Sequence, residues 1–136
     1  MTLTLNHRYG FGTKLNLPFE TTVDQVKAAL KEQGFGVLTE IDVQKTMKEK
    51  LGVDFRPYLI LGACNPLLAH QALSAELEIG LLLPCNVIVY AADDGTVVEA
   101  MDPEVALGIV GNPAVEPVAR VAREKLVKAM EKLAGA

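Results

Sequence analysis

The sequence predicts an α+β protein in which a mostly antiparallel sheet, the first of two layers, carries its helices on one face. Three observations support this fold class: a period-two pattern near the N-terminus, a strong hairpin signal at Asp93-Asp94-Gly95, and a clear amphipathic helix near the C-terminus. The chain has 136 residues, and half of them are hydrophobic. It is therefore long enough to bury a substantial core, and we expect one domain over residues 1–136.

Composition and charge argue against several classes of function. The net charge is −4, whereas a nucleic-acid-binding protein needs a basic face that releases counterions. The longest apolar run, "IGLLLPCNVIVYAA", is interrupted by Gly80, Pro84 and Asn86 and is too short to span a bilayer. We expect no nucleic-acid partner, no membrane partner and a cytoplasmic location. The two cysteines, with no secretory pattern at the N-terminus, are typical of reduced thiols.

The first predicted element is a long half-buried strand, or a hairpin bent at its glycines, over residues 3–17. Odd positions of this segment are mostly apolar and even positions mostly polar, which is the period of a strand. Gly10 and Gly12 fall on the polar side, where they allow close approach of another part of the chain. A helix follows, with Thr22 predicted as the N-cap of a capping box and Gly34 as its C-terminal stop.

Two more strands and two short helices are predicted in the middle of the chain. The runs "FGVLTEID" and "PYLILGA" are typical of strands. Asp42 is a suitable N-cap for a short helix that ends at Gly52. Asn65 is a suitable N-cap for the second helix, because Pro66 then occupies the position where a missing N–H costs nothing. This second helix is predicted to run to about Glu78.

A hairpin is predicted where "NVIVYA" and "TVVEAM" flank the Asp-Gly pair, since this pair tolerates the positive φ of tight turns. With Asp94-Gly95 as the two-residue loop, alternate residues share a face. The predicted core face holds Val87, Val89, Ala91, Val98 and Ala100. The other face is too apolar for open solvent, so this chain or a partner should cover part of it. Its interface candidates are Ile88, Tyr90 and Met101.

The last element, "EPVARVAREKLVKAMEKL", is the clearest helix of the chain. Its apolar residues recur at helical spacing and its charged residues occupy the opposite side. The apolar stripe consists of Val118, Val121, Ala122, Leu126, Met130 and Leu133.

Two motifs then carry a resemblance to a known family. "LGACNP" over residues 61–66 and "LLPCNV" over residues 82–87, within a match that runs from "YGFG" to the C-terminal helix, resemble the family of domain of unknown function number 302. The resemblance implies a TATA-binding-protein-like topology of strand, helix, four strands and helix, with the short helices after Asp42 and Asn65 inserted between strands. It also implies a homodimer. It implies no activity, and this topology alone does not transfer DNA binding.

The same motifs contain the candidate ligand-binding residues Cys64, Asn65, Cys85 and Asn86. Cys64 ends one strand and Cys85 begins the next, so we expect the two strand ends to meet. Two close thiols can cycle as a dithiol or bind a soft metal. The alternative is a purely structural role, in which both thiols are buried and Asn65 serves only as a helix cap. A zinc site needs four ligands at short spacing, so we predict neither a metal nor a cofactor.

Two further residues, Glu76 and His70, are weaker candidates on the helix after Asn65. His70 lies at the margin of the apolar stripe, where histidines are commonly solvated. Glu76 falls near the middle of that stripe but close to the helix end. If Glu76 were buried, its pKa would rise and it would become the best acid–base group of the chain.

Two functions remain open. The preferred one is a non-enzymatic, homodimeric binding or interaction module, with a small-molecule pocket near the two Cys-Asn motifs. The alternative is a thiol-based redox or carrier enzyme that uses Cys64 and Cys85. The preference rests on missing chemistry, because the sequence spacing places no base beside either thiol and assigns no catalytic residue.

Overall fold

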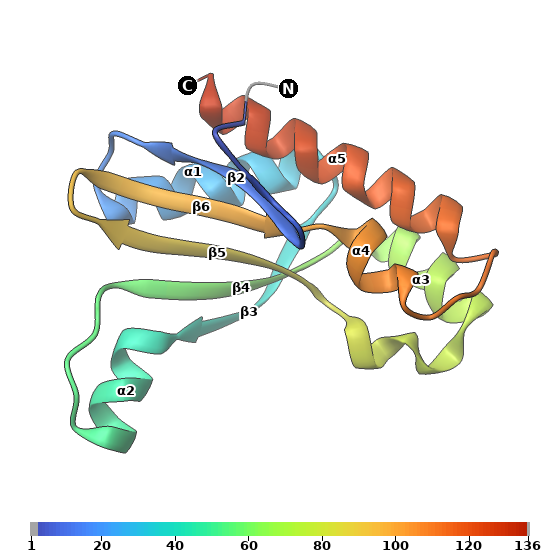
Figure 1. Ribbon diagram of the computed structural model, residues 1–136, viewed down its shortest axis with the longest axis horizontal. Helices are drawn as coiled ribbons and strands as arrows, with labels where there is room; N and C mark the ends of the chain where they lie inside the picture. The colour runs from blue at the N-terminus through green and yellow to red at the C-terminus, as the bar shows by residue number, and fades with distance from the viewer. Residues whose placement is uncertain (1–2, 136) are drawn as a thin grey trace.

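The computed structural model describes residues 3–135 of the chain. Within this range six strands form one antiparallel sheet in the order β1-β2-β6-β5-β4-β3 (Figure 1). The predicted α+β fold is confirmed, with the first strand present as a hairpin. The elements in chain order are β1 (Leu5–His7), β2 (Gly10–Leu15), α1 (Phe19–Glu32), β3 (Gly36–Asp42), α2 (Val43–Leu51), β4 (Tyr58–Cys64), α3 (Pro66–Ala75), the 3₁₀ helix η1 (Leu77–Leu82), β5 (Cys85–Ala92), β6 (Gly95–Met101), α4 (Pro103–Gly108) and α5 (Glu116–Ala134).

The start of α1 differs from the prediction. The helix begins at Phe19, directly after the extended residue Pro18. Thr22 is therefore not an N-cap but lies inside the first turn, where its hydroxyl donates a hydrogen bond to the carbonyl oxygen of Pro18 at 2.9 Å. Threonine makes this bond to the residue four positions back within helices. The capping-box pattern was a local match that the helix did not use.

The main core lies between the sheet and the two long helices α1 and α5. Helix α5 packs against β2 and α1, so both helices cover the same face of the sheet. Of the residues predicted for the core face of β5 and β6, Val87, Val89, Val98 and Ala100 lie in this core, whereas Ala91 is only partly buried and lies outside it. The turn itself is shifted, because Ala92 pairs with Gly95. The shift of two in the register leaves the predicted faces unchanged.

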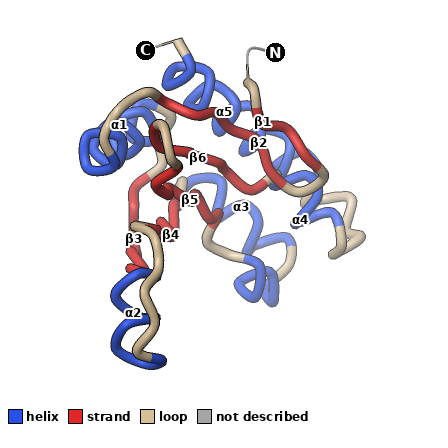
Figure 2. The backbone as a smooth tube through the Cα atoms, turned by 60° about the vertical axis from the view of Figure 1, so that its left-hand side comes forward, coloured by secondary structure: helices blue, strands red, loops and turns tan. Residues whose placement is uncertain are grey.

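The opposite face of the sheet, here called the open face, is not covered by any helix of residues 3–135. Strand register places these side chains on it: Tyr58, Ile60, Asn86, Ile88, Tyr90, Val97, Glu99 and Met101. The three predicted interface candidates among them are only partly buried. Helix α2, begun by Asp42 as predicted, projects from the β3–β4 end of the sheet, away from α1 and α5 (Figures 1 and 2).

A second, smaller core lies beyond the ends of β4 and β5. It is formed where α3, η1, α4 and the first turns of α5 meet, around Ala72, Ile79 and Leu107. Asn65 begins α3 as predicted, but the helix ends at Ala75 and not at Glu78. Glu76 is extended there, and the chain continues as the tighter helix η1. This change of direction returns the chain to the start of β5.

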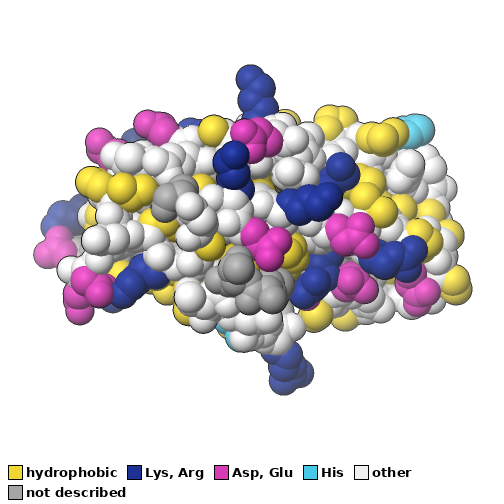
Figure 3. Space-filling view, turned by 90° about the horizontal axis from the view of Figure 1, so that it is seen from above, with side chains coloured by type: hydrophobic (Ala, Val, Ile, Leu, Met, Phe, Trp, Pro, Cys, Tyr) yellow, Lys and Arg dark blue, Asp and Glu magenta, His cyan; other side chains and the backbone are white. Residues whose placement is uncertain are grey.

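The charged residues of the α5 side are mixed in sign. Figure 3 looks onto this side and shows Lys and Arg side chains interspersed with Asp and Glu. Among the described residues visible there, no extended basic area of the kind that binds nucleic acid is present. In residues 3–135 no helix combines the length and the apolar character needed to cross a membrane.

Candidate functional site

The two Cys-Asn motifs lie side by side at one end of the sheet. Strand β4 ends at Cys64 and β5 begins at Cys85, and Ala63 is the direct antiparallel partner of Cys85. Because paired strands lie about 5 Å apart and Cys64 is one residue beyond that partner, the two cysteine Cα atoms are about 6 Å apart. The end of β4 and the start of β5 therefore lie side by side, as predicted.

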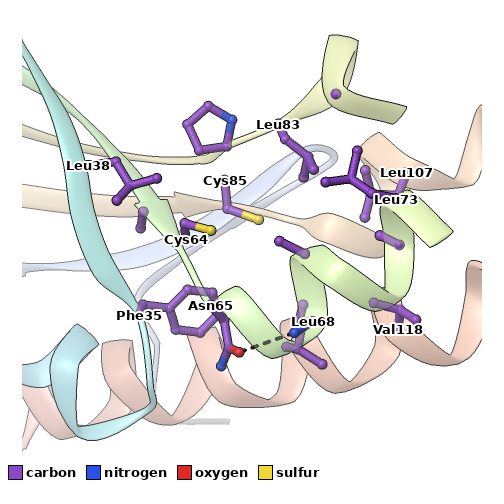
Figure 4. A pocket seen from close by; sticks show the side chains of 16 residues that line it. Phe35, Leu38, Cys64, Asn65, Leu68, Leu73, Leu83, Cys85, Leu107 and Val118 are labelled. Atoms are coloured by element: carbon purple, nitrogen blue, oxygen red, sulfur yellow. Dashed lines mark hydrogen bonds between the residues drawn. The ribbon is translucent and has the colours of Figure 1, made fainter. Parts of the chain in front are cut away.

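A cavity of about 290 Å³ opens beside these strand ends (Figure 4). Its walls come from the ends of β3, β4 and β5, from α3, and from the sides of α4 and α5 that face the second core. Almost all of the wall is carbon, because the lining residues are aliphatic or aromatic except for two thiols and one amide. The lining residues are Phe35, Leu38, Ala63, Cys64, Asn65, Leu68, Ala69, Ala72, Leu73, Gly80, Leu83, Pro84, Cys85, Leu107, Val118 and Ala122.

Both thiols face the cavity but differ in exposure. Figure 4 shows the sulfur atoms of Cys64 and Cys85 on the cavity side of their strands. Cys85 is buried and Cys64 is partly exposed, and both are free thiols. Burial, with a smaller contribution from the neighbouring Cys64, raises the pKa of Cys85 to about 11. The Cys85 thiol is thus protonated at neutral pH, which makes it a poor nucleophile.

Asn65 fixes the N-terminus of α3. Its side-chain oxygen accepts a hydrogen bond from the backbone N–H of Leu68 at 3.3 Å, which caps the helix. Its amide nitrogen donates to the carbonyl oxygen of Gln33 at 3.3 Å, which ties α3 to the end of α1. A Cβ at Gly34 would lie 2.9 Å from this nitrogen. Both the oxygen and the nitrogen of the Asn65 side chain therefore make a hydrogen bond to the backbone.

The other three candidate residues do not line the cavity. Asn86 is exposed and pairs with Gly62, on the open face. His70 is exposed on the outer side of α3. Glu76 is only partly buried, and its carboxylate accepts a hydrogen bond from the side chain of Asn112 at 3.0 Å. The structure thus brings together Cys64, Asn65 and Cys85 and separates them from these three.

Several wall residues were not identified from the sequence. Leu107 and Val118 come from elements far along the chain, and Leu38 lies where the β3–β4 register shifts between Val37 and Thr39. Apolar side chains carry no chemical signal of a site, so only the fold could reveal them. Among the described residues, no group of three or more His, Cys, Asp or Glu side chains could hold a metal ion.

The difference between the thiols predicts selective alkylation. At pH 8 we expect iodoacetamide to modify Cys64 first and to modify Cys85 at least about a hundredfold more slowly than an unperturbed thiol, because so little thiolate is present. Mass spectrometry of peptides from the native protein measures both rates. In urea the two rates should converge. Equal rates in the native protein would contradict the burial of Cys85.

Replacing Asn65 separates its two roles. We expect Asn65→Ala to lower the free energy of unfolding by about 2 kcal/mol, because it removes a helix cap and a hydrogen bond to a partly buried carbonyl. Asn65→Asp keeps the capping oxygen but loses the donor to Gln33, so its loss should be about half as large. Urea denaturation of both variants tests this order. Equal losses would show that the cap contributes nothing.

A family model described as "Domain of unknown function DUF302" matches residues 11–133. A solved structure, described as the crystal structure of uncharacterized conserved protein DUF302 from Bacillus stearothermophilus, is 28% identical with a TM-score of 0.86, over 93% of this chain and 99% of that chain. No curated protein matches. Neither description names a ligand or an activity.

Proposed function

Since the chain belongs to the family described as domain of unknown function DUF302, whose description names no activity, we propose a function from the geometry: a homodimeric binding module that holds a small molecule beside Cys64 and Cys85. The observation that carries the proposal is the cavity of about 290 Å³. Small-molecule sites are clefts or cavities lined mostly by apolar side chains with a few polar groups, as this one is. An apolar cavity of about 150 Å³ is enough to bind benzene. This cavity is therefore large enough for a ligand.

A binding role fits the cavity better than catalysis. Among the described residues that line it, none is His, Asp, Glu, Lys or Arg. General acid–base chemistry needs such a group within hydrogen-bond reach of the reacting atom. Chemistry in this cavity would therefore depend on the thiols alone, and the Cys85 thiol is protonated at neutral pH.

A thiol-based redox or carrier enzyme is the second candidate function. It is favoured by the common orientation of the two sulfur atoms toward the cavity (Figure 4) and by a Cα separation of about 6 Å, which a disulfide can span. The raised pKa of Cys85 counts against it. The alkylation experiment described above separates the two functions if the rate of Cys64 is compared with that of an unperturbed thiol: a redox enzyme requires Cys64 to react faster, whereas a binding module does not.

The open face supports the dimeric part of the proposal. The solvent-accessible surface of the chain is 7779 Å², whereas a compact monomer of 14.6 kDa exposes roughly 6,900 Å². The excess is close to the roughly 800 Å² that one partner buries in a standard interface. A second copy of this chain is the occupant proposed here, since a two-fold contact places one open face against the other.

The projecting arm formed by α2 and the segment after it extends this apolar surface. Leu51 is 69% exposed, and Val53 and Phe55 are also exposed. At the base of the arm the ring of Tyr58 stacks on that of Tyr90 at 5.4 Å between centroids. The arm therefore continues directly from the open face, and in the dimer proposed here it contacts the partner copy.

Binding in the cavity can be tested with variants that fill it. We expect at least one compound from a panel of small molecules of different charge and polarity to raise the Tm of the wild-type protein. The same compound should not stabilise Ala72→Leu, because Ala72 is buried and lines the cavity. Ala28→Leu, the same substitution at an exposed position of α1, should behave like the wild type. Equal stabilisation of all three proteins would place binding elsewhere.

A further inference from the structure

The cavity has no group that could pair with a charged ligand. The polar side-chain groups among its lining residues are the two thiols and the amide of Asn65. That amide already donates to Gln33 and accepts from Leu68. A carboxylate or ammonium in the cavity would lose its hydration and gain no ion pair, which is costly in an apolar environment.

The size of the cavity sets the size of the ligand. Its volume of about 290 Å³ is roughly twice that of the apolar cavity known to bind benzene. A molecule of about ten carbon atoms, such as naphthalene, would fill it to a similar degree. The ring of Phe35 and the sulfur atoms of Cys64 and Cys85 supply wall contacts that favour flat apolar molecules.

The cavity wall is also apolar where Leu38 and Cys64 reach solvent. Leu38, which lines the cavity, is 69% exposed. Cys64, beside it, is partly exposed. Figure 4 shows Leu38 and Cys64 on the same side of the cavity, at the β3–β4 end. A ligand that enters here passes carbon and sulfur atoms, so nothing along this route selects for charge.

We infer that the cavity takes an uncharged, hydrocarbon-like molecule of about ten carbon atoms and rejects carboxylates of the same size. This inference names the ligand class of the binding function proposed above and rests on it. It is set by the wall residues, none of which carries a charge, and by the two backbone bonds that hold the Asn65 amide in place.

Naphthalene and 1-naphthoate form a matched pair of probes, because they share a ring system and differ in one carboxylate. The readout is alkylation of Cys64 in the native full-length protein at pH 8, since this thiol lines the cavity and is partly exposed. With naphthalene at about ten times its Kd, labelling of Cys64 should slow by about tenfold, because only the free protein reacts. The same concentration of 1-naphthoate should leave the rate unchanged.

Two cavity-filling variants serve as site controls. In Ala72→Leu, and in Ala69→Leu from the same helix, naphthalene should no longer slow the labelling of Cys64, whereas Ala28→Leu should behave like the wild type. Using two filling variants guards against misfolding of either, which circular dichroism detects. Equal protection by 1-naphthoate would overturn the ligand class and keep the cavity as a binding site. If neither probe slows the labelling of Cys64, the proposed ligand class is wrong. If, in addition, no compound of the wider panel binds, the proposed binding function is wrong as well.

Discussion

Gly12→Ala is expected to lower the free energy of unfolding by about 3 kcal/mol or more, a large part of the stability of a domain of this size. A Cβ at this position would lie 1.9 Å from the carbonyl oxygen of Val98 and 2.7 Å from the Cα of Glu99. Both atoms belong to the backbone of β6, which pairs with β2. They cannot move away without breaking the pairing of two central strands. Urea denaturation measures the loss.

The matched control for this substitution is Gly36→Ala in the edge strand β3. A Cβ at Gly36 meets no atom within 4 Å, so the change in stability should stay within about 0.5 kcal/mol. Both substitutions replace a strand glycine by alanine, and they differ in what surrounds the added methyl group. Equal stability of the two variants would contradict the close approach of β2 and β6 at Gly12.

Ile88→Lys is expected to convert the proposed dimer to a monomer. Ile88 lies in the open face, directly opposite Glu99. In the monomer the new lysine lies opposite the Glu99 carboxylate, which already contacts Nε2 of His7 at 2.6 Å, and the opposite charges across the two strands should allow the fold to be retained. In a face-to-face dimer the added charge is buried in both copies, which should weaken association by about a thousandfold or more. Sedimentation velocity at tens of micromolar protein measures the effect.

Ile109→Lys provides the matched control for this experiment, because Ile109 is 76% exposed and follows α4, outside the open face. Wild type and Ile109→Lys should sediment with twice the chain mass of 14.6 kDa, and Ile88→Lys with the chain mass itself. A wild-type protein that sediments as a monomer would refute the dimer. An unchanged mass for Ile88→Lys would move the interface away from the open face.

Local rules of sequence predicted much of the fold. Asp42 and Asn65 begin helices because a side-chain oxygen at that position satisfies a free N–H, whatever the rest of the protein does. The faces of β5 and β6 follow from the period of two. Local rules failed where a tertiary contact decides the conformation. The Asp-Gly pattern predicts Gly95 in the turn, whereas the structure has Gly95 at the start of β6, where a Cβ would lie 2.3 Å from the carbonyl oxygen of Leu15.

The candidate site was predicted in part for the same reason. The meeting of Cys64 and Cys85 follows from two consecutive strands joined by a helical return. Asn86 could have been separated from the cavity, because neighbouring residues of a strand point to opposite faces and Cys85 points inward. The walls contributed by Leu107 and Val118 could not be predicted, since packing between distant helices is not encoded in any local pattern.

The irregular edge of the sheet has a consequence for how far association can proceed. The β3–β4 register shifts between Val37 and Thr39, and β1, at the other edge, has only three residues. A bulged edge and a short edge are poor templates for adding further strands. Edge-to-edge stacking, which would grow without limit into fibres, is therefore disfavoured on both sides of the sheet. In the dimer proposed here, two copies join through their open faces, and such a contact closes on itself after two.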